Sequence, residues 1–290
     1  MTGDFSTTKI DPKKYPIFSN IKTRLIQFER DLRIKKFDRI ASNYESSLTL
    51  CEKLRTIAIK NDEEYCANVA YILKTNISLI RNIAQFWELC EEYEYPTAWT
   101  HLQNSLNLCE TLLKFCDAET SEPFIVIHEY LSLIEKLFPY TVFCSTEIGD
   151  IVVKCSICGK SAFDPECTHI AGNLYWGKVA HNVVISLKSL NGIALVPNPA
   201  DKRCIIHIDY DKESPEKSRF KYVYSFIKKS KRPLSNLKFR KSEREIPRSE
   251  FTHELKQWPC PCGSGMLFEE CCFDKDIIKV PHIEIFYDRE

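Results

Sequence analysis

Residues 69–87, VAYILKTNISLIRNIAQFW, decide the architecture of the first half of this 290-residue chain. Their apolar side chains recur every three or four residues, which is the spacing of one face of an α-helix. The stretch lies within residues 17–95, which contain neither glycine nor proline, and only one of the eight glycines precedes Gly149. So long a run without turn-forming residues predicts long helices joined by short connections.

Similar apolar stripes lie on both sides of this stretch and predict four more helices. They cover residues 21–32, 37–58, 99–116 and 127–138. Tyr95-Pro96 marks a break, because a residue that precedes proline avoids helical geometry. We expect Ser121-Glu122-Pro123 to open the fifth helix, since proline costs least in a first turn. Residues 18–138 therefore form a five-helix bundle or two to three helical hairpins, with helix-pair repeats of the tetratricopeptide kind left open.

From residue 141 onward the sequence changes to short β-branched runs at residues 151–153, 183–185, 193–196 and 204–208. Turn-forming residues, among them Gly149-Asp150 and Asn191-Gly192, separate these runs. This pattern predicts a small, mostly antiparallel sheet built around a cysteine cluster. The predicted fold class is α+β. Four segments are expected: a helical bundle (1–140), a zinc-binding β-rich domain (141–211), a basic linker (212–256) and a zinc module (257–290) that ends in a strand at 283–286.

The fourteen cysteines include close groups, and the C-terminal group has the form C-x-C-x8-C-C over residues 260–272. Thiols this close are poor disulfide frameworks and good metal ligands, and four thiolates suit a tetrahedral zinc ion. Gly263 and Gly265 allow a tight turn after the first pair. We expect the amides of these glycines to hydrogen-bond the sulfurs.

This group resembles a SEC-C motif, the zinc module named from the C-terminus of the SecA translocase. The resemblance is carried by Cys-Pro-Cys-Gly-Ser-Gly at 260–265, Phe268 and Cys271-Cys272. The resemblance covers about 15 residues and implies four zinc ligands, namely Cys260, Cys262, Cys271 and Cys272. Because the module is appended to many unrelated bacterial proteins, it implies a contact role and not translocase activity. Typical copies carry lysines between the cysteine pairs; this copy carries Met266, Leu267, Glu269 and Glu270.

A second group has the form C-x2-C-x8-C-x-H and predicts a Cys3His zinc set. Its members are Cys155, Cys158, Cys167 and His169. A closed set of four protein ligands is typical of a structural site. His169 is the expected fourth ligand, and Cys144, Cys204 and His181 are the alternatives to it. Two segments near this group, 167–177 and 193–201, resemble a pattern in uncharacterised bacterial zinc proteins.

Residues 217–249 carry twelve Lys or Arg and two Glu, although the whole chain is neutral. The densest positions are Lys228, Lys229, Lys231, Arg232, Lys238, Arg240 and Lys241. Aromatic residues at 220, 222, 224 and 226 alternate as in a strand with one aromatic face. Cations beside aromatic rings suit nucleic acid. The alternatives are a segment whose charges face acidic helices or water, or one that contacts another acidic partner.

Composition and motifs limit the classes of function that this chain can have. Residues 1–20 hold no apolar segment of signal-peptide length, and no run of 18 apolar residues occurs, so we expect a cytoplasmic protein without a membrane contact. No G-x-S-x-G, H-E-x-x-H or phosphate-binding loop is present. The sequence thus favours an adaptor with two structural zinc ions and a protein or nucleic-acid partner, in an undetermined oligomeric state. The alternatives are nucleic-acid binding or processing through residues 217–249, and a metal-dependent hydrolase with an open metal position.

Overall fold

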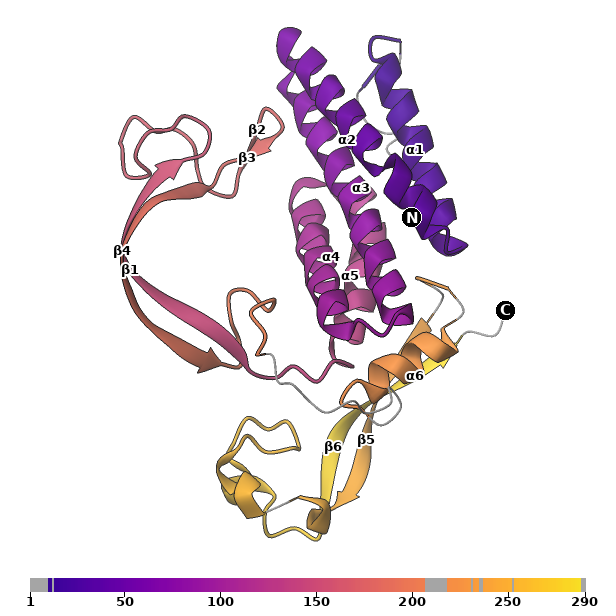
Figure 1. The fold of residues 1–290 in the computed structure, drawn as a ribbon, viewed down its shortest axis with the longest axis vertical. Helices are drawn as coiled ribbons and strands as arrows, with labels where there is room; N and C mark the ends of the chain where they lie inside the picture. Colours follow the sequence, from indigo (N-terminus) through magenta and orange to yellow (C-terminus); the bar gives the residue numbers. More distant parts are fainter. Residues whose placement is uncertain are drawn as a thin grey trace. The chain divides into compact units, whose positions relative to one another are not determined.

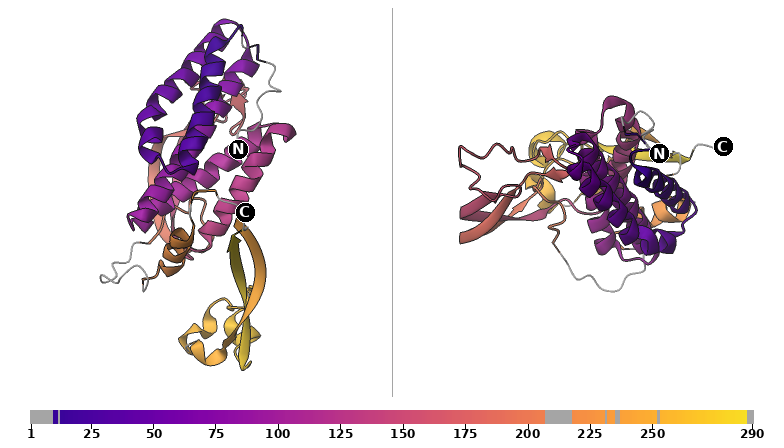
Figure 2. Two further views of the ribbon diagram at one scale, coloured as in Figure 1. Left: turned by 90° about the vertical axis from the view of Figure 1, so that its right-hand side faces the viewer. Right: turned by 90° about the horizontal axis from the view of Figure 1, so that it is seen from above.

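The computed structural model describes residues 10–11, 13–206, 218–230, 232–234, 237–251 and 253–287. The chain divides into two compact units, Met1–Pro233 and Leu234–Glu290, which are described separately. The fold is α+β, as the sequence predicts: helices lead, small two-stranded sheets follow, and a cysteine cluster lies near the C-terminus (Figures 1 and 2). Within the described residues, no helix combines the length and the apolar character that crossing a membrane requires.

The first unit begins with the predicted helices, which pack side by side (Figure 1). They are α1 (Pro16–Arg33), α2 (Phe37–Lys60), α3 (Glu64–Glu91), α4 (Tyr95–Phe115) and α5 (Ala118–Glu135). Helix α3 contacts α1, α2 and α4, and its stripe is wholly buried: Leu73, Ile77 and Trp87 are not exposed at all. The apolar spacing of 69–87 therefore did decide this half of the fold.

The fifth helix begins earlier than expected. The prediction that Ser121-Glu122-Pro123 opens it is wrong, because α5 starts at Ala118 and holds Pro123 inside. Asp117 is the reason: its side chain accepts a hydrogen bond from the Thr120 amide at 3.0 Å and so caps the helix. Proline this near the start removes one helical hydrogen bond, a loss that the cap and the apolar face offset.

A long two-stranded ribbon follows the helices, formed by β1 (Phe143–Cys155) and β4 (Asn182–Val196) in antiparallel pairing. The predicted turns at Gly149-Asp150 and Asn191-Gly192 are wrong, because both dipeptides lie inside the strands. Glu147 pairs with Gly192 and Ile148 with Leu190, so Asn191 is the extra residue of a bulge. The bulge bends and twists the ribbon near these turn-forming residues instead of ending it.

Between these strands lies a loop with the short hairpin β2 (Leu174–Tyr175) and β3 (Lys178–Val179). The predicted run at 204–208 contributes one isolated bridge, between Ile205 and Phe143, and its residues 207 and 208 lie outside the described residues.

Helix α6 (Lys221–Lys229) closes the first unit, so the strand predicted at 220–226 is wrong. The aromatic residues alternate, but Val223 and Phe226 also have helical spacing, and both are buried. The ring of Phe226 lies 5.8 Å from that of Trp87, at the end of α3. Packing against this aromatic end of the helical bundle selects the helix over the strand.

The second unit is a hairpin of β5 (Leu237–Pro247) and β6 (Ile277–Tyr287), paired antiparallel along their full length. Strand β6 contains the strand predicted at 283–286, whereas β5 comes from the segment predicted as a basic linker. The connection between the strands holds two short 3-10 helices, η2 (Arg248–Glu250) and η3 (His253–Gln257), and the one-turn helix α7 (Phe268–Cys271). Its small core is formed by Cys260, Phe268, Cys272 and Ile278.

Candidate metal centres

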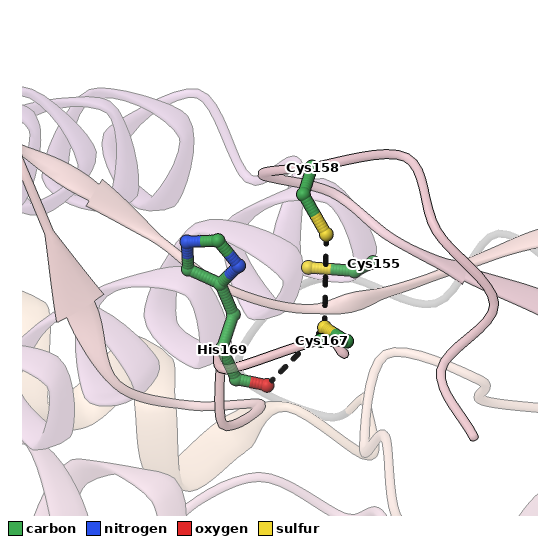
Figure 3. Close-up of side chains that lie close together, drawn as sticks. All are labelled: Cys155, Cys158, Cys167 and His169. Atoms are coloured by element: carbon green, nitrogen blue, oxygen red, sulfur yellow. Dashed lines mark hydrogen bonds between the residues drawn. The ribbon is translucent and has the colours of Figure 1, made fainter. Parts of the chain in front are cut away.

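The central cluster lies where the ribbon ends. Cys155 is the last residue of β1, Cys158 follows in a turn, and Cys167 and His169 lie in the loop before β2. The ligand atoms of these four residues all lie within 4.8 Å of one another, and the sulfurs of Cys158 and Cys167 are 3.6 Å apart (Figure 3). The structure thus brings together all four residues of the C-x2-C-x8-C-x-H pattern, and they can hold one metal ion.

The turn after β1 orients the first two thiols. The Gly159 amide donates to the Cys155 carbonyl at 2.9 Å, and Gly159 has a φ of 72°, a conformation that glycine adopts without strain. The amides of Cys158 and Ile157 donate hydrogen bonds to the Cys155 sulfur and lower the pKa of that thiol. Because the thiolate is the form that ligates metal, this turn prepares Cys155 for binding.

His169 is the one residue of this group that offers a nitrogen atom. Its Nδ1 atom is buried and has no hydrogen-bond partner among the described residues, which fits a nitrogen reserved for a metal. The ring of Tyr175 lies perpendicular to the imidazole at 4.9 Å, and the Tyr175 hydroxyl accepts a hydrogen bond from the Ile170 amide at 3.0 Å. Tyr175 therefore supports both the imidazole and the loop that carries it.

The three substitutes for His169 lie outside the group of four. Cys144 and Cys204 are neighbours at the far end of β1, where the Cys144 amide donates to the Cys204 carbonyl at 2.8 Å. The Nδ1 atom of His181 lies 3.3 Å from the Val179 carbonyl oxygen and has a partner of its own.

Helices α2 and α3 hold the loop of the central cluster, a feature that the sequence analysis missed. Arg55 donates from Nε to the Trp176 carbonyl at 2.7 Å. Glu64 accepts from the Trp176 amide at 3.1 Å, and Asn68 accepts from the Gly177 amide at 2.7 Å. Polar side chains far away in sequence thus bind the backbone of the β2–β3 turn. In the sequence, the only feature that could have pointed to this contact was a glycine within the segment 167–177.

Replacing Gly177 by alanine is expected to detach this turn from the helices. Gly177 has a φ of 73°, and an added Cβ would lie 2.5 Å from the Ala67 carbonyl oxygen. The strained conformation alone costs about 1–3 kcal/mol. We expect faster hydrogen exchange of the Trp176 and Gly177 amides and a lower melting temperature. Gly192→Ala is the control because its Cβ meets nothing within 4 Å; equal behaviour of the two variants would contradict the clash.

The second cluster consists of Cys260, Cys262, Cys271 and Cys272, whose sulfurs also lie within 4.8 Å of one another. The Cys262 and Cys271 sulfurs are 3.5 Å apart, and those of Cys271 and Cys272 are 3.7 Å apart. A bridge between Pro259 and Leu267 closes the loop that carries the first pair. Cys271 is the last residue of α7, and Cys272 is its C-cap. Since Cys260 and Cys272 belong to the core, this metal site and the packing of the second unit depend on each other.

Ser264 sets the electrostatics of this cluster. Its hydroxyl, then the Cys260 thiol and the Ser264 amide, hydrogen-bond the Cys262 sulfur and lower the pKa of Cys262 to about 6. Burial instead raises the pKa of Cys260 to about 12. The expectation that the glycine amides bond the sulfurs fails for Gly263, whose amide donates to the Cys260 carbonyl at 3.0 Å. Gly263 turns the backbone, with a φ of 77°, and the residue after it supplies the donors.

The basic positions fall in two places. Lys228 and Lys229 are exposed in the last turn of α6, and Arg232 is exposed shortly after it. Lys231 lies outside the described residues. Lys238, Arg240 and Lys241 lie in β5 at positions whose side chains also lie outside the described part. The first group thus belongs to the first unit, and the β5 positions belong to the second.

Comparison with known proteins identifies one segment of the chain. No curated protein and no solved structure matches the chain at a significant level. A family model for the SEC-C motif matches residues 259–274. This match encloses all four cysteines of the second cluster, so the C-terminal cysteine cluster of this chain belongs to a SEC-C motif.

Proposed function

We propose that this chain is an interaction protein stabilised by two structural zinc ions. Thiolate sulfur and imidazole nitrogen are preferred zinc ligands, and zinc in structural sites is tetrahedral. Each cluster supplies four such ligands, which fills the coordination of one ion. A catalytic zinc keeps a position open for water, so a hydrolase is the weaker alternative.

The surface of the SEC-C motif carries this proposal. Trp258, Met266 and Leu267 are exposed by 57%, 47% and 38%. Trp258 and Leu267 lie on neighbouring stretches of backbone. The amide of Phe268, the residue after Leu267, donates a hydrogen bond to the Trp258 carbonyl at 2.9 Å. Two of these residues lie between the cysteine pairs, where typical copies carry lysines. An exposed tryptophan beside aliphatic side chains suits an apolar protein surface better than phosphate or an acidic surface.

A paired substitution tests this contact. Trp258→Ala with Met266→Lys is expected to weaken capture of a partner protein by about tenfold or more, since a buried tryptophan often contributes ~2 kcal/mol or more to binding. Zinc content and circular dichroism are expected to stay unchanged, because neither side chain is a ligand or part of the core. Tyr222→Ala, which removes an equally exposed ring from α6, is the control. Capture that is indifferent to the pair, or that depends equally on Tyr222, would rule out this surface.

Nucleic acid is the second candidate for the binding partner, and the exposed side chains of helix α6 support it. Lys228 and Lys229 are exposed there, and Tyr222 is 58% exposed, with the Lys221 ammonium 5.2 Å from its ring centre. Cations beside an exposed ring suit single-stranded RNA, because the ring stacks on a base while the cations neutralise phosphates.

Reversal of Lys228 and Lys229 to glutamate tests this candidate. If α6 binds RNA, fluorescence anisotropy with a single-stranded oligonucleotide will show weaker binding. The slope of log affinity against log salt will also become shallower, by roughly 0.7 per lost phosphate contact. Lys53→Glu, an exposed reversal on α2, is the matched control. Equal affinities and slopes for all three proteins would exclude α6 as the contact.

A further inference from the structure

A cavity of about 480 Å³ lies in the first unit, between helices α2 and α3 and the loop that carries the central cluster. Glu52 and Arg55 of α2 and Lys74 of α3 line one side of it. Residues of the segments 156–157 and 177–181 line the other side. Small-molecule sites in proteins have volumes of roughly 300–1,000 Å³, so this cavity is large enough to hold a small ligand.

The charged side chains that line this cavity are three cations and one carboxylate. The cations belong to Arg55, Lys74 and Lys178, and the carboxylate belongs to Glu52. Glu52 accepts a hydrogen bond from Nη1 of Arg55 at 2.6 Å. Lys74 and Lys178 form no ion pair with another described residue. With three positive charges against one negative charge, the cavity attracts an anion.

The Arg55 guanidinium is held in place by the protein itself. Its Nε atom donates to the Trp176 carbonyl at 2.7 Å, its Nη1 atom donates to Glu52, and its side chain is only 15% exposed. The other terminal nitrogen, Nη2, donates to no described residue and keeps its N–H groups for a ligand. A guanidinium that is already oriented loses little conformational freedom when it binds an oxyanion.

Ser156 adds a hydrogen-bond donor on the opposite wall. Its hydroxyl oxygen accepts a hydrogen bond from the His181 amide at 2.9 Å, and its own amide donates to the His181 carbonyl at 2.9 Å. Because the hydroxyl acts as an acceptor in this contact, its hydrogen can be donated to a ligand in the cavity. A guanidinium, two ammonium groups and a hydroxyl together suit the oxygens of a phosphate group.

Apolar side chains line the part of the cavity that the charged groups do not. Tyr71, Ile157 and Val179 lie there and are half-buried. The Tyr71 ring is packed edge-on against Phe115, with 6.0 Å between the ring centres. Such a surface favours a ligand that joins an apolar ring to its anionic group. A phosphate monoester meets both conditions, since it carries a charge of about −1.5 to −2 at pH 7.

We propose that this cavity binds a small phosphate monoester that carries an aromatic ring. The cations bind the phosphate group, and the ring packs against the apolar side chains of the opposite part of the cavity. The site uses neither the SEC-C surface nor α6. It therefore goes beyond the proposed partner contacts, and each of the two proposals can fail without the other.

Calorimetric titration of the full-length, zinc-loaded protein tests the proposal. The probes are phenyl phosphate, adenosine 5′-monophosphate and uridine 5′-monophosphate, each compared with its unphosphorylated counterpart and with inorganic phosphate. At least one ester is expected to bind about tenfold or more tightly than both of its comparison compounds, because it alone fills the charged and the apolar parts of the cavity. If none of the three esters does so, the proposal is wrong.

Substitution of the two exposed lysines shows whether an ester binds in this cavity. Lys74→Ala with Lys178→Ala is expected to weaken its binding about tenfold or more, whereas Lys74→Arg with Lys178→Arg keeps both charges and most of the affinity. Lys53→Ala is the matched control, because Lys53 is exposed on α2 and does not line the cavity. Zinc content and circular dichroism are expected to stay unchanged, since none of these lysines is a proposed ligand or a core residue. An ester that binds the alanine pair as tightly as the wild type would place its site elsewhere and overturn the proposal.

Discussion

Cys272→Ser is expected to unfold the connection between β5 and β6 while helices α1–α5 keep their structure. The substitution removes a proposed metal ligand and, at the same position, a side chain of the small core formed by Cys260, Phe268, Cys272 and Ile278. Structural zinc contributes an apparent ~10–16 kcal/mol in comparably small modules, which is more than such a core supplies. Bound zinc is therefore expected to fall from two ions per chain to one.

Hydrogen exchange read by mass spectrometry distinguishes local from global unfolding. Amides of residues 248–276 are expected to lose their protection in the Cys272→Ser protein, and those of α3 are expected to keep it, because the two segments belong to different units. Cys204→Ser is the matched control: Cys204 is an exposed thiol outside both clusters. Loss of protection in α3, or an unchanged second zinc ion, would contradict the prediction.

Sequence spacing predicts those parts of this fold that depend on neighbouring residues. The stripe at 69–87 became α3 because helical burial needs only a local repeat. The ligand patterns at 155–169 and 260–272 assembled for the same reason, since each lies within one short loop. The predictions for 121–123 and 220–226 failed where a distant or competing group decided the outcome. Asp117 capped α5 earlier, and Trp87 supplied the surface on which α6 packs.

Two features depend on contacts that no local pattern records. Arg55 and Asn68 hold the turn at Trp176 and Gly177 from more than a hundred residues away in sequence. The ribbon was missed because Gly149-Asp150 and Asn191-Gly192 have the composition of turns, and only the pairing of β1 with β4 shows that a bulge takes them up. The continuity of the ribbon, and hence its exposed surface, is a property of the pair of strands.

His169→Ala is expected to release the central metal ion and leave the SEC-C ion in place. His169 is the only residue of the central group that offers a nitrogen ligand, and no other described His, Cys, Asp or Glu lies within the group to replace it. His181→Ala is the matched control, because His181 belongs to the same loop and lies outside the group. Two zinc ions per chain are therefore expected in the His181 variant and one in the His169 variant.

The loop that carries the central cluster has two supports, namely the proposed metal ion and helices α2 and α3. Without the ion, residues 156–170 are expected to exchange rapidly, because they form no described strand or helix of their own. The turn at Trp176 and Gly177 is expected to keep its protection, since its hydrogen bonds to Arg55, Glu64 and Asn68 do not involve the cluster. Equal zinc content in the two histidine variants would show that His169 is not a ligand. Loss of protection at Gly177 would show instead that the ion, and not the helices, holds the tip of the ribbon in place.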